Sequence, residues 1–264
     1  MKFFVDTAML SEIEWAMGIG CDGVTTNPSL IKKAVDALKA NGENVDMMSY
    51  IRKICETAGR CRDVSLEVVS LESEKMIKEA VVLYNKFNIL ANNVVVKIPV
   101  STASTSHYEG LKAMSALQRK QIPVNATLVF TPEQALMCGK LGAKYVSPFA
   151  GRIDDMLRSK SGIVFDKSEY FPEQGIRMDD NGIVSGIDLV RKTVAILKNY
   201  GMKTEVIAAS LRNARQVREA ALAGAHVATI PFNVLEEMTK HPKTAEGVMA
   251  FAKDVVPEYR AIFD

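Results

Sequence analysis

The chain of 264 residues contains few cysteines and histidines and no long apolar run. Its four cysteines form no C-x-x-C pair, and its three histidines lack the spacing of metal ligands. Neither a disulfide scaffold nor a metal site is therefore expected. No apolar stretch approaches the roughly 20 residues of a membrane helix. No glycine-rich loop ending in Gly-Lys-Ser or Gly-Lys-Thr is present, which argues against nucleotide hydrolysis.

Charge is close to balanced, with a formal net charge of +2. Such a chain lacks the strongly basic surface that binds nucleic acid or an anionic membrane, although a local basic pocket for a small anion is compatible with it. The first strand-like run begins at once, without a secretory segment, and the cysteines are interpreted as reduced thiols. The expectation is a cytoplasmic protein.

One apparent cofactor motif is excluded by its context. Residues 18–23 match the pattern G-x-G-x-x-G, which binds a dinucleotide where it follows a strand and opens a helix. Here the pattern ends a helical stretch and leads into a strand, so we interpret it as a turn.

Short β-branched runs alternate with segments of helical periodicity along the whole sequence. The predicted strands are Lys2–Val5, Gly23–Thr26, Asp63–Val69, Val94–Ile98, Pro123–Val129, Lys144–Pro148, Thr204–Ala209 and His226–Ile230. Eight strands that alternate with helices predict an α/β protein with a parallel sheet closed into a (β/α)8 TIM barrel. An open doubly wound sheet is the second choice. No linker interrupts the composition, so residues 1–264 are predicted to form a single catalytic domain.

Helix starts and extra segments complete the expected architecture. Capping patterns predict helix starts at Ser11, Thr131, Asn213 and Asn233. Residues 36–57 are predicted to add a helix between the second and third strands. Residues 154–182 are polar and rich in turn residues, which suits an insertion that forms a lid, an extra helix or an oligomer contact. Residues 243–264 are expected to form an amphipathic helix that packs outside the barrel.

Polar residues stand at nearly every predicted strand end, where barrels of this type carry their active sites. They are Asp6, Asn27, Glu67, Lys97, Asn125, Thr127, Ser147 and Ser210. One such residue would mean little, but a residue at almost every strand end predicts an active site.

Lys97 follows the apolar run 94–96. Desolvation among apolar residues favours a neutral amine, which is the nucleophile that attacks a ketone to form an imine. The alternative is a strand-end lysine that reaches water. Glu67 suits proton transfer through a water also held by Thr127, or else a core ion pair with Lys97.

Asp6 could take a proton from a substrate hydroxyl, or it could cap the first helix. Arg152, Ser210 and Arg212 suit an anion site. Arginine binds phosphate with two parallel hydrogen bonds, and Ser210 precedes a helix whose free N–H groups favour an anion. A surface charge is the alternative for each arginine.

Six motifs in this order resemble the transaldolase family, which includes small transaldolases and the related fructose-6-phosphate aldolases. They are Phe4-Val-Asp6-Thr, Gly23-Val-Thr-Thr-Asn-Pro-Ser29, Val95-Val-Lys97-Ile-Pro, Asn125-Ala-Thr-Leu-Val-Phe130, Val146-Ser-Pro-Phe-Ala-Gly-Arg152-Ile and Ala208-Ala-Ser-Leu-Arg-Asn213. The resemblance runs through nearly the whole chain.

The resemblance implies a class I aldolase mechanism without a metal or organic cofactor. Lys97 would form a Schiff base with the ketose, Asp6 would handle the donor hydroxyl proton, and Glu67 with Thr127 would hold the proton-shuttling water. The dihydroxyacetone portion would be bound by Asn27, Asn125 and Ser147, and the phosphate by Arg152, Ser210 and Arg212.

The implied activity transfers a dihydroxyacetone unit from fructose 6-phosphate or sedoheptulose 7-phosphate to an aldose phosphate, as in the pentose phosphate pathway. By this resemblance, Phe149 occupies a position at which transaldolases have Phe and the fructose-6-phosphate aldolases have Tyr. Glu67 stands where the aldolases have Gln. Both favour transaldolase, and a fructose-6-phosphate aldolase is the alternative. A non-catalytic sugar-phosphate-binding barrel and an unrelated Schiff-base barrel rank lower. A homo-oligomer is expected. Small members of the family resemble ring-stacked decamers, whereas classical members resemble dimers or monomers, so the resemblance leaves the oligomeric state open.

Overall fold

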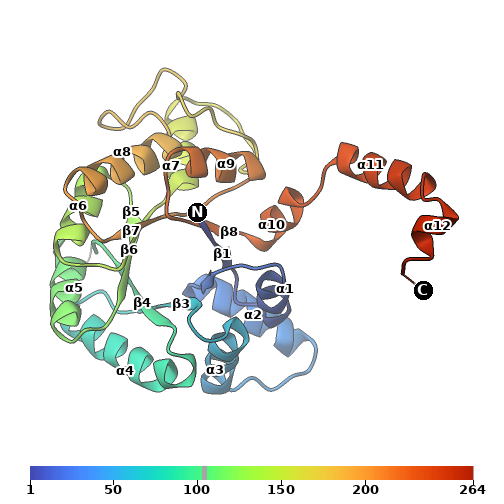
Figure 1. Cartoon of the computed structure of the whole chain (residues 1–264). Coiled ribbons are helices and arrows are strands. Elements are labelled where there is room, and N and C mark those ends of the chain that lie inside the picture. The colour runs from blue at the N-terminus through green and yellow to red at the C-terminus, as the bar shows by residue number, and fades with distance from the viewer. Residues whose placement is uncertain (103–105, 264) are drawn as a thin grey trace.

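Eight parallel strands form a closed barrel in the order of the sequence, and the last strand pairs with the first (Figure 1). The computed structural model describes residues 1–102 and 106–263. The strands are β1 (Lys2–Asp6), β2 (Gly23–Thr25), β3 (Asp63–Glu67), β4 (Val94–Pro99), β5 (Val124–Val129), β6 (Tyr145–Pro148), β7 (Glu205–Ala208) and β8 (Val227–Ile230). The TIM-barrel prediction is confirmed, and each strand begins and ends within two residues of the predicted position.

The helices before residue 240 surround this barrel on the outside, and the last two extend away from it (Figure 1). They are α1 (Leu10–Gly18), α2 (Pro28–Ala40), α3 (Met47–Ala58), α4 (Ser73–Ala91), α5 (Glu109–Arg119), α6 (Pro132–Lys140), α7 (Ala150–Lys160), α8 (Gly186–Asn199), α9 (Ala214–Leu222), α10 (Phe232–Met238), α11 (Pro242–Lys253) and α12 (Pro257–Arg260). The extra helix predicted between the second and third strands is confirmed, because both α2 and α3 lie there. Among the described residues, no helix is long and apolar enough to cross a membrane.

Two of the four predicted helix starts are confirmed. Thr131 and Gln134 form a reciprocal capping box at α6, and the Asn213 side chain accepts a hydrogen bond at the start of α9. The other two starts are wrong. Helix α1 begins before Ser11, at Leu10, and α10 begins directly after Pro231. The N-cap of α10 is Pro231, whose side chain has no hydrogen-bond acceptor, so this helix has no side-chain cap.

The interior of the barrel changes from apolar to polar along the strands. Phe4, Val95, Tyr145, Ile207 and Val227 form a separate buried cluster inside it. Because strand side chains alternate between faces, the residues two positions further on point to the same side. These are Asp6, Lys97, Ser147, Ala209 and Thr229, and all of them line one cavity. The carboxyl ends of the strands therefore carry a polar layer above an apolar floor.

The outer faces of the strands pack against the helices in one large hydrophobic cluster. A smaller cluster secures the segment between α7 and α8, where Ile153, Leu157 and Phe171 pack with Ile183 and Leu189. Residues 154–160 of the predicted insertion belong to α7 itself. The rest continues as an extended loop to Ser185, with one isolated bridge between Asp180 and Ile183.

Residues 243–264 are predicted to form a helix that packs on the outside of the barrel; the described part of this segment is helical, but the predicted packing is wrong. Helices α11 and α12 extend away from it (Figure 1), and neither contains a buried residue. Phe251, Ile262 and Phe263 are each at least 70% exposed. The amphipathic pattern is present, but the barrel already has its helical cover and offers this segment no contact.

Candidate active site

Lys97 lies at the centre of the polar layer. Strand register places it directly between Glu67 of β3 and Asn125 of β5. Its side chain is buried, with the residue 5% exposed, so the alternative of a lysine that reaches water is wrong. Lys97 Nζ lies 3.2 Å from Glu67 Oε2 and donates a hydrogen bond of 3.1 Å to the carbonyl of Thr26. The ion pair considered for Glu67 is therefore present.

Asp6 faces Lys97 from the end of β1. Its Oδ1 accepts a hydrogen bond of 2.6 Å from Thr25 Oγ1, and Thr25 also contacts Thr229. Burial raises the pKa of Asp6, although the charge of Lys97 and the hydrogen bond from Thr25 both oppose this. The alternative role of helix cap is wrong, because α1 has no side-chain cap; the Thr7 hydroxyl accepts only from the N–H of Met9, which precedes the helix. A carboxyl group with a raised pKa can both take and return a proton.

Thr127 lies beside an irregularity in β5. The pairing of β5 with β6 shifts between Ala126 and Val129, and Leu128 between them has a φ of 56°. Such bulges re-aim side chains next to active sites. Thr127 Oγ1 is buried and has no hydrogen-bond partner among the described residues. Its hydrogen-bonding capacity is therefore unused by these residues, although Thr127 does not line the cavity at the carboxyl end of the barrel.

A chain of hydrogen bonds joins Ser147, Asn125 and Ser65, which lie on three different strands. Ser147 Oγ donates to Asn125 Oδ1 at 2.7 Å, and Asn125 Nδ2 donates to Ser65 Oγ at 3.1 Å. Asn27 caps α2 by accepting from the N–H of Leu30 through Oδ1. Its amide nitrogen remains for other contacts. These bonds fix the orientation of each amide before any ligand binds.

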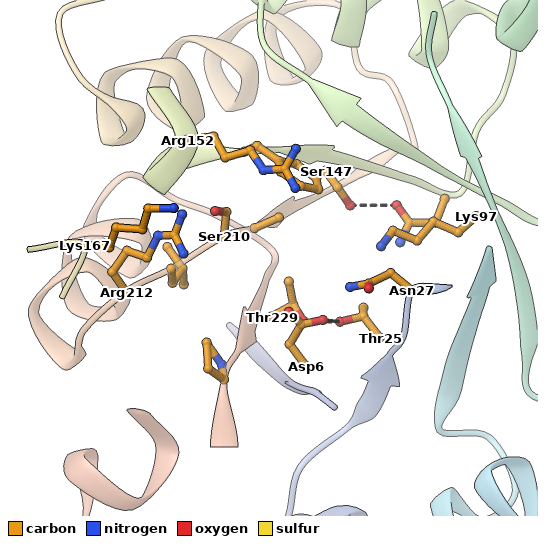
Figure 2. A pocket seen from close by; sticks show the side chains of 15 residues that line it. Asp6, Thr25, Asn27, Lys97, Ser147, Arg152, Lys167, Ser210, Arg212 and Thr229 are labelled. Carbon is orange, nitrogen blue, oxygen red and sulfur yellow. Dashed lines mark hydrogen bonds between the residues drawn. The ribbon is translucent and has the colours of Figure 1, made fainter. Parts of the chain in front are cut away.

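A cavity of about 300 Å³ opens over this layer at the carboxyl end of the barrel (Figure 2). Nine of the eleven residues predicted for the site line it: Asp6, Asn27, Lys97, Asn125, Ser147, Phe149, Arg152, Ser210 and Arg212. The other two do not line it: Glu67 pairs with Lys97, and Thr127 is buried. The structure thus gathers residues from seven strands or strand ends into one place.

Sequence reasoning missed several of the lining residues. Thr25 and Thr229 were overlooked because threonines within a strand are common, although each lies in the inward-facing register of its strand. Lys167 comes from the loop between α7 and α8, and no strand periodicity points to it. Its place at the cavity is a product of the loop conformation alone.

The outer end of the cavity is cationic. The guanidinium of Arg152 lies 5.2 Å from the centre of the Phe149 ring, and Arg212 forms a salt bridge of 2.9 Å with Asp155. Ser210 has a φ of 61°, a conformation that a non-glycine residue adopts at a cost and that recurs at functional sites. The described residues contain no group of three or more His, Cys, Asp or Glu side chains that could hold a metal ion.

Fold and cavity together describe a TIM barrel that can hold a small polar ligand with an anionic end. The chain matches the family model described as Transaldolase/Fructose-6-phosphate aldolase over residues 3–262. It is 44% identical over 255 residues to a "Probable transaldolase" of Prosthecochloris aestuarii, with 96% of this chain and 97% of the relative covered. A "Probable transaldolase" of Bacillus cereus is 42% identical with the same coverage. The chain therefore belongs to the transaldolase/fructose-6-phosphate aldolase family.

Solved structures support the fold alone. A mandelate oxidase mutant superposes with a TM-score of 0.51 and 13% sequence identity, covering 88% of this chain and 65% of that one. At this identity the likeness concerns the barrel and carries nothing about the reaction.

Proposed function

We propose that this protein is a transaldolase that moves a dihydroxyacetone unit from a ketose phosphate to an aldose phosphate through a Schiff base on Lys97. The observation that carries the proposal is the buried amine of Lys97, which pairs with the carboxylate of Glu67 and lines the same cavity as Asp6, a cavity with a cationic outer end. A binding protein needs no amine nucleophile, whereas imine chemistry needs both the amine and acid–base groups beside it.

The first step joins the ketose to Lys97. Glu67 Oε2 lies 3.2 Å from Nζ and can accept the proton that the amine gives up before it attacks the ketone carbon. Glu67 then returns this proton to the carbinolamine hydroxyl, which leaves as water while the nitrogen lone pair forms the iminium double bond. The positive nitrogen then serves as an electron sink for the next step.

Carbon–carbon cleavage follows. Asp6 takes the proton of the hydroxyl on the far carbon of the bond that breaks, so that this C–O group becomes the aldehyde of the leaving sugar. The electron pair of that bond moves toward the iminium nitrogen, so an aldose phosphate leaves and an enamine remains on Lys97. An incoming aldehyde reverses these events, because the enamine carbon attacks its carbonyl and Asp6 returns the proton. Burial raises the pKa of Asp6, which suits a group that both takes and returns a proton.

Hydrolysis of the new iminium ion completes the turnover. We assign Glu67 and Thr127 to this step, since the carboxylate contacts Lys97 and the Thr127 hydroxyl is buried without a partner among the described residues. We assign the binding of the dihydroxyacetone hydroxyls to Asn27, Asn125 and Ser147.

The phosphate group is assigned to the outer end of the cavity. Arg152, Ser210 and Arg212 line that end together, and arginine matches the geometry of phosphate oxygens. Phe149 forms the wall beneath Arg152 and supplies no hydroxyl to the reacting atoms. This favours transfer to an acceptor over release of free dihydroxyacetone.

Borohydride trapping tests the proposal. Reduction in the presence of fructose 6-phosphate should attach the sugar fragment to Lys97, and Lys97→Met should abolish the adduct. Lys144→Met is the matched control, because Lys144 also pairs with a barrel carboxylate, Asp63, but at the opposite end. An adduct that persists on another lysine in Lys97→Met would refute the assignment.

The release of glyceraldehyde 3-phosphate from fructose 6-phosphate separates the two activities of the family. Release that requires erythrose 4-phosphate identifies a transaldolase. Equal release without it identifies an aldolase, and no release with tight sugar-phosphate binding identifies a binding protein.

The proposal extends to assembly and location. The exposed apolar side chains of α11 and α12 support a homo-oligomer in which another copy covers them. The four cysteines are free thiols, which supports a reducing compartment such as the cytoplasm. Residues 1–264 are proposed to act as one catalytic domain.

A further inference from the structure

Three cations line the outer end of the cavity, and one of them comes from outside the barrel. Arg152 and Arg212 follow strand ends, whereas Lys167 belongs to the loop between α7 and α8. In Figure 2, Lys97 lies toward one end of the cavity, and Lys167 with Arg212 lies toward the other. The loop thus adds a charge to a site that the strands alone would leave with two.

Most of this charge is uncompensated. Arg212 has a carboxylate partner in Asp155 at 2.9 Å. Neither Arg152 nor Lys167 forms a salt bridge with any residue in the part of the chain that the structure describes. The carboxylate next to Lys167 in sequence, Asp166, accepts hydrogen bonds from Ser168 instead. Two unpaired cations match the charge of a phosphate monoester, which is between one and two negative units at neutral pH.

The loop is held by a buried arginine on one side of Lys167. Arg158 of α7 is 6% exposed, and its guanidinium donates to the carbonyls of Glu169 at 2.9 Å and Tyr170 at 2.8 Å. A longer bond of 3.4 Å reaches the carbonyl of Asp166. A buried guanidinium must have its donors satisfied, so these carbonyls cannot leave without a large penalty.

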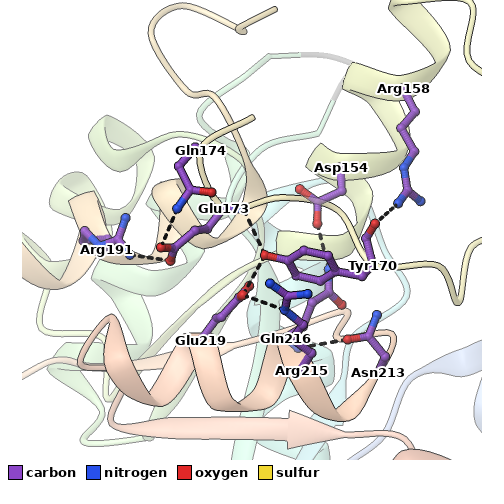
Figure 3. A network of polar contacts seen from close by, with 10 residues as sticks. All are labelled: Asp154, Arg158, Tyr170, Glu173, Gln174, Arg191, Asn213, Arg215, Gln216 and Glu219. Atoms are coloured by element: carbon purple, nitrogen blue, oxygen red, sulfur yellow. Dashed lines mark hydrogen bonds and ion pairs between the residues drawn. The ribbon is translucent and has the colours of Figure 1, made fainter. Parts of the chain in front are cut away.

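Helix α9 holds the same loop from the other side (Figure 3). The hydroxyl of Tyr170 donates to Glu219 at 2.7 Å, and the guanidinium of Arg215 lies 3.6 Å from the centre of the Tyr170 ring. Asn213 Nδ2 donates to the carbonyl of Ser168 at 3.0 Å. Asn213 also caps α9, so a single side chain joins the start of this helix to the loop.

Lys167 itself lies in a defined turn between these anchors. The N–H of Glu169 bonds to the carbonyl of Asp166 at 3.1 Å, and the Asp166 side chain accepts from the N–H of Ser168 at 2.7 Å. Aspartate at the first position of a turn stabilises it by such a bond. The backbone on both sides of Lys167 is therefore held by hydrogen bonds, which gives Lys167 a defined place at the cavity.

We propose that Lys167 is a third ligand of the substrate phosphate, and that the loop from Ser161 to Ser185 exists in this chain to position it. This inference rests on the proposed function for the identity of the ligand. Lys167 would act on the terminal phosphate of both the ketose donor and the aldose acceptor. It makes the enzyme selective for phosphorylated acceptors, because an unphosphorylated aldehyde offers Lys167 nothing to bind. Tyr170 is the corresponding positioning residue.

Lys167→Met tests the proposal by removing the charge and keeping most of the alkyl chain. We expect KM for erythrose 4-phosphate to rise about tenfold with little change in kcat, because one charge-assisted contact is lost. The KM for unphosphorylated erythrose should stay the same. Lys167→Arg should restore most of the affinity. Lys198→Met, which removes an exposed lysine of α8 outside the cavity, is the matched control and should match the wild type.

Tyr170→Phe tests the positioning role. It removes the hydroxyl that donates to Glu219 but does not alter the Lys167 side chain itself. The KM for erythrose 4-phosphate should rise by a smaller factor, roughly threefold, while kcat and the KM for unphosphorylated erythrose are unchanged. A purely structural role would lower kcat for both acceptors together.

Calorimetric titration with inorganic phosphate separates this inference from the proposed function, since it requires no turnover. The wild type should bind phosphate about tenfold more tightly than Lys167→Met. Equal binding by both proteins would overturn the role of Lys167, and so would a wild type that binds no phosphate. An inactive enzyme whose phosphate affinity still depends on Lys167 would overturn the transaldolase proposal and leave the anion site standing.

Discussion

Asp154→Asn should change how the stability of this protein depends on pH. Asp154 of α7 is 3% exposed, and its carboxyl group accepts hydrogen bonds from the N–H of Gly186 and from Gln216, each at 2.7 Å. Burial raises the pKa of Asp154 from 3.8 to about 7. The N–H of Gly186, the charge of Arg158 and the bond from Gln216 oppose this rise, whereas Asp155 adds to it.

The direction of the effect follows from where the proton is bound. The unfolded carboxyl group loses its proton near pH 3.8, whereas the folded one keeps it to about pH 7. The folded state is therefore favoured fully below pH 3.8, and this contribution is lost as the pH rises through 7. At about 1.4 kcal/mol for each unit of pKa, the shift corresponds to about 4 kcal/mol, of which about 3 kcal/mol disappears between roughly pH 4.5 and 7.5.

Thermal unfolding followed by circular dichroism at several pH values measures this directly. Asparagine does not titrate, so Asp154→Asn should gain stability relative to the wild type as the pH rises. A change of about 3 kcal/mol corresponds to roughly 6–12 °C in Tm for a chain of this size. Asp254→Asn, a change at an exposed acid after α11, should follow the wild type at every pH. A Tm difference that stays constant, or that moves the other way, would show that Asp154 is ionised in the folded protein and refute the reasoning.

Three further predictions concern packing, catalysis and assembly. Gly151→Ala places a methyl group 2.1 Å from a backbone carbonyl oxygen beside the phosphate end, so it should lower the free energy of unfolding by about 1–3 kcal/mol in a urea titration. Gly247→Ala, where nothing lies within 4 Å, should not; equal losses in both would contradict the packing argument. Thr25→Val removes the hydrogen bond that lowers the pKa of Asp6, so the acidic limb of the kcat/KM profile should move to higher pH. An unmoved limb would mean that it reports another group. Deletion of residues 242–264 should reduce the mass seen by light scattering, because their exposed apolar side chains are proposed to meet another copy; an unchanged mass would place the interface elsewhere.

The sequence alone was sufficient for the barrel and for most of the polar layer. Strand length, β-branched content and turn residues are local properties, and eight alternating units allow few other closed arrangements. Residues at strand ends, such as Lys97 and Asn125, were found because parallel strands bring all their carboxyl ends to one side. Period-two alternation then decides which of them point inward.

Contacts between distant segments could not be obtained in this way. The tail illustrates this, because its amphipathic pattern predicts a helix but not the surface against which the helix packs. Helices α11 and α12 form, yet they leave the barrel without a buried residue. An apolar stripe along a helix indicates that the helix can pack against another surface, but it does not specify which surface.

Lys97 and Lys167 mark the boundary between the two kinds of information. By itself, the sequence determined that Lys97 follows an apolar strand, since that depends on neighbours in the chain. Only the tertiary structure decided that Glu67 pairs with Lys97 and that Lys167 reaches the cavity. Those placements depend on barrel register and on a loop fastened by Arg158 and α9, and such hydrogen bonds join groups whose separation in sequence carries no periodic pattern.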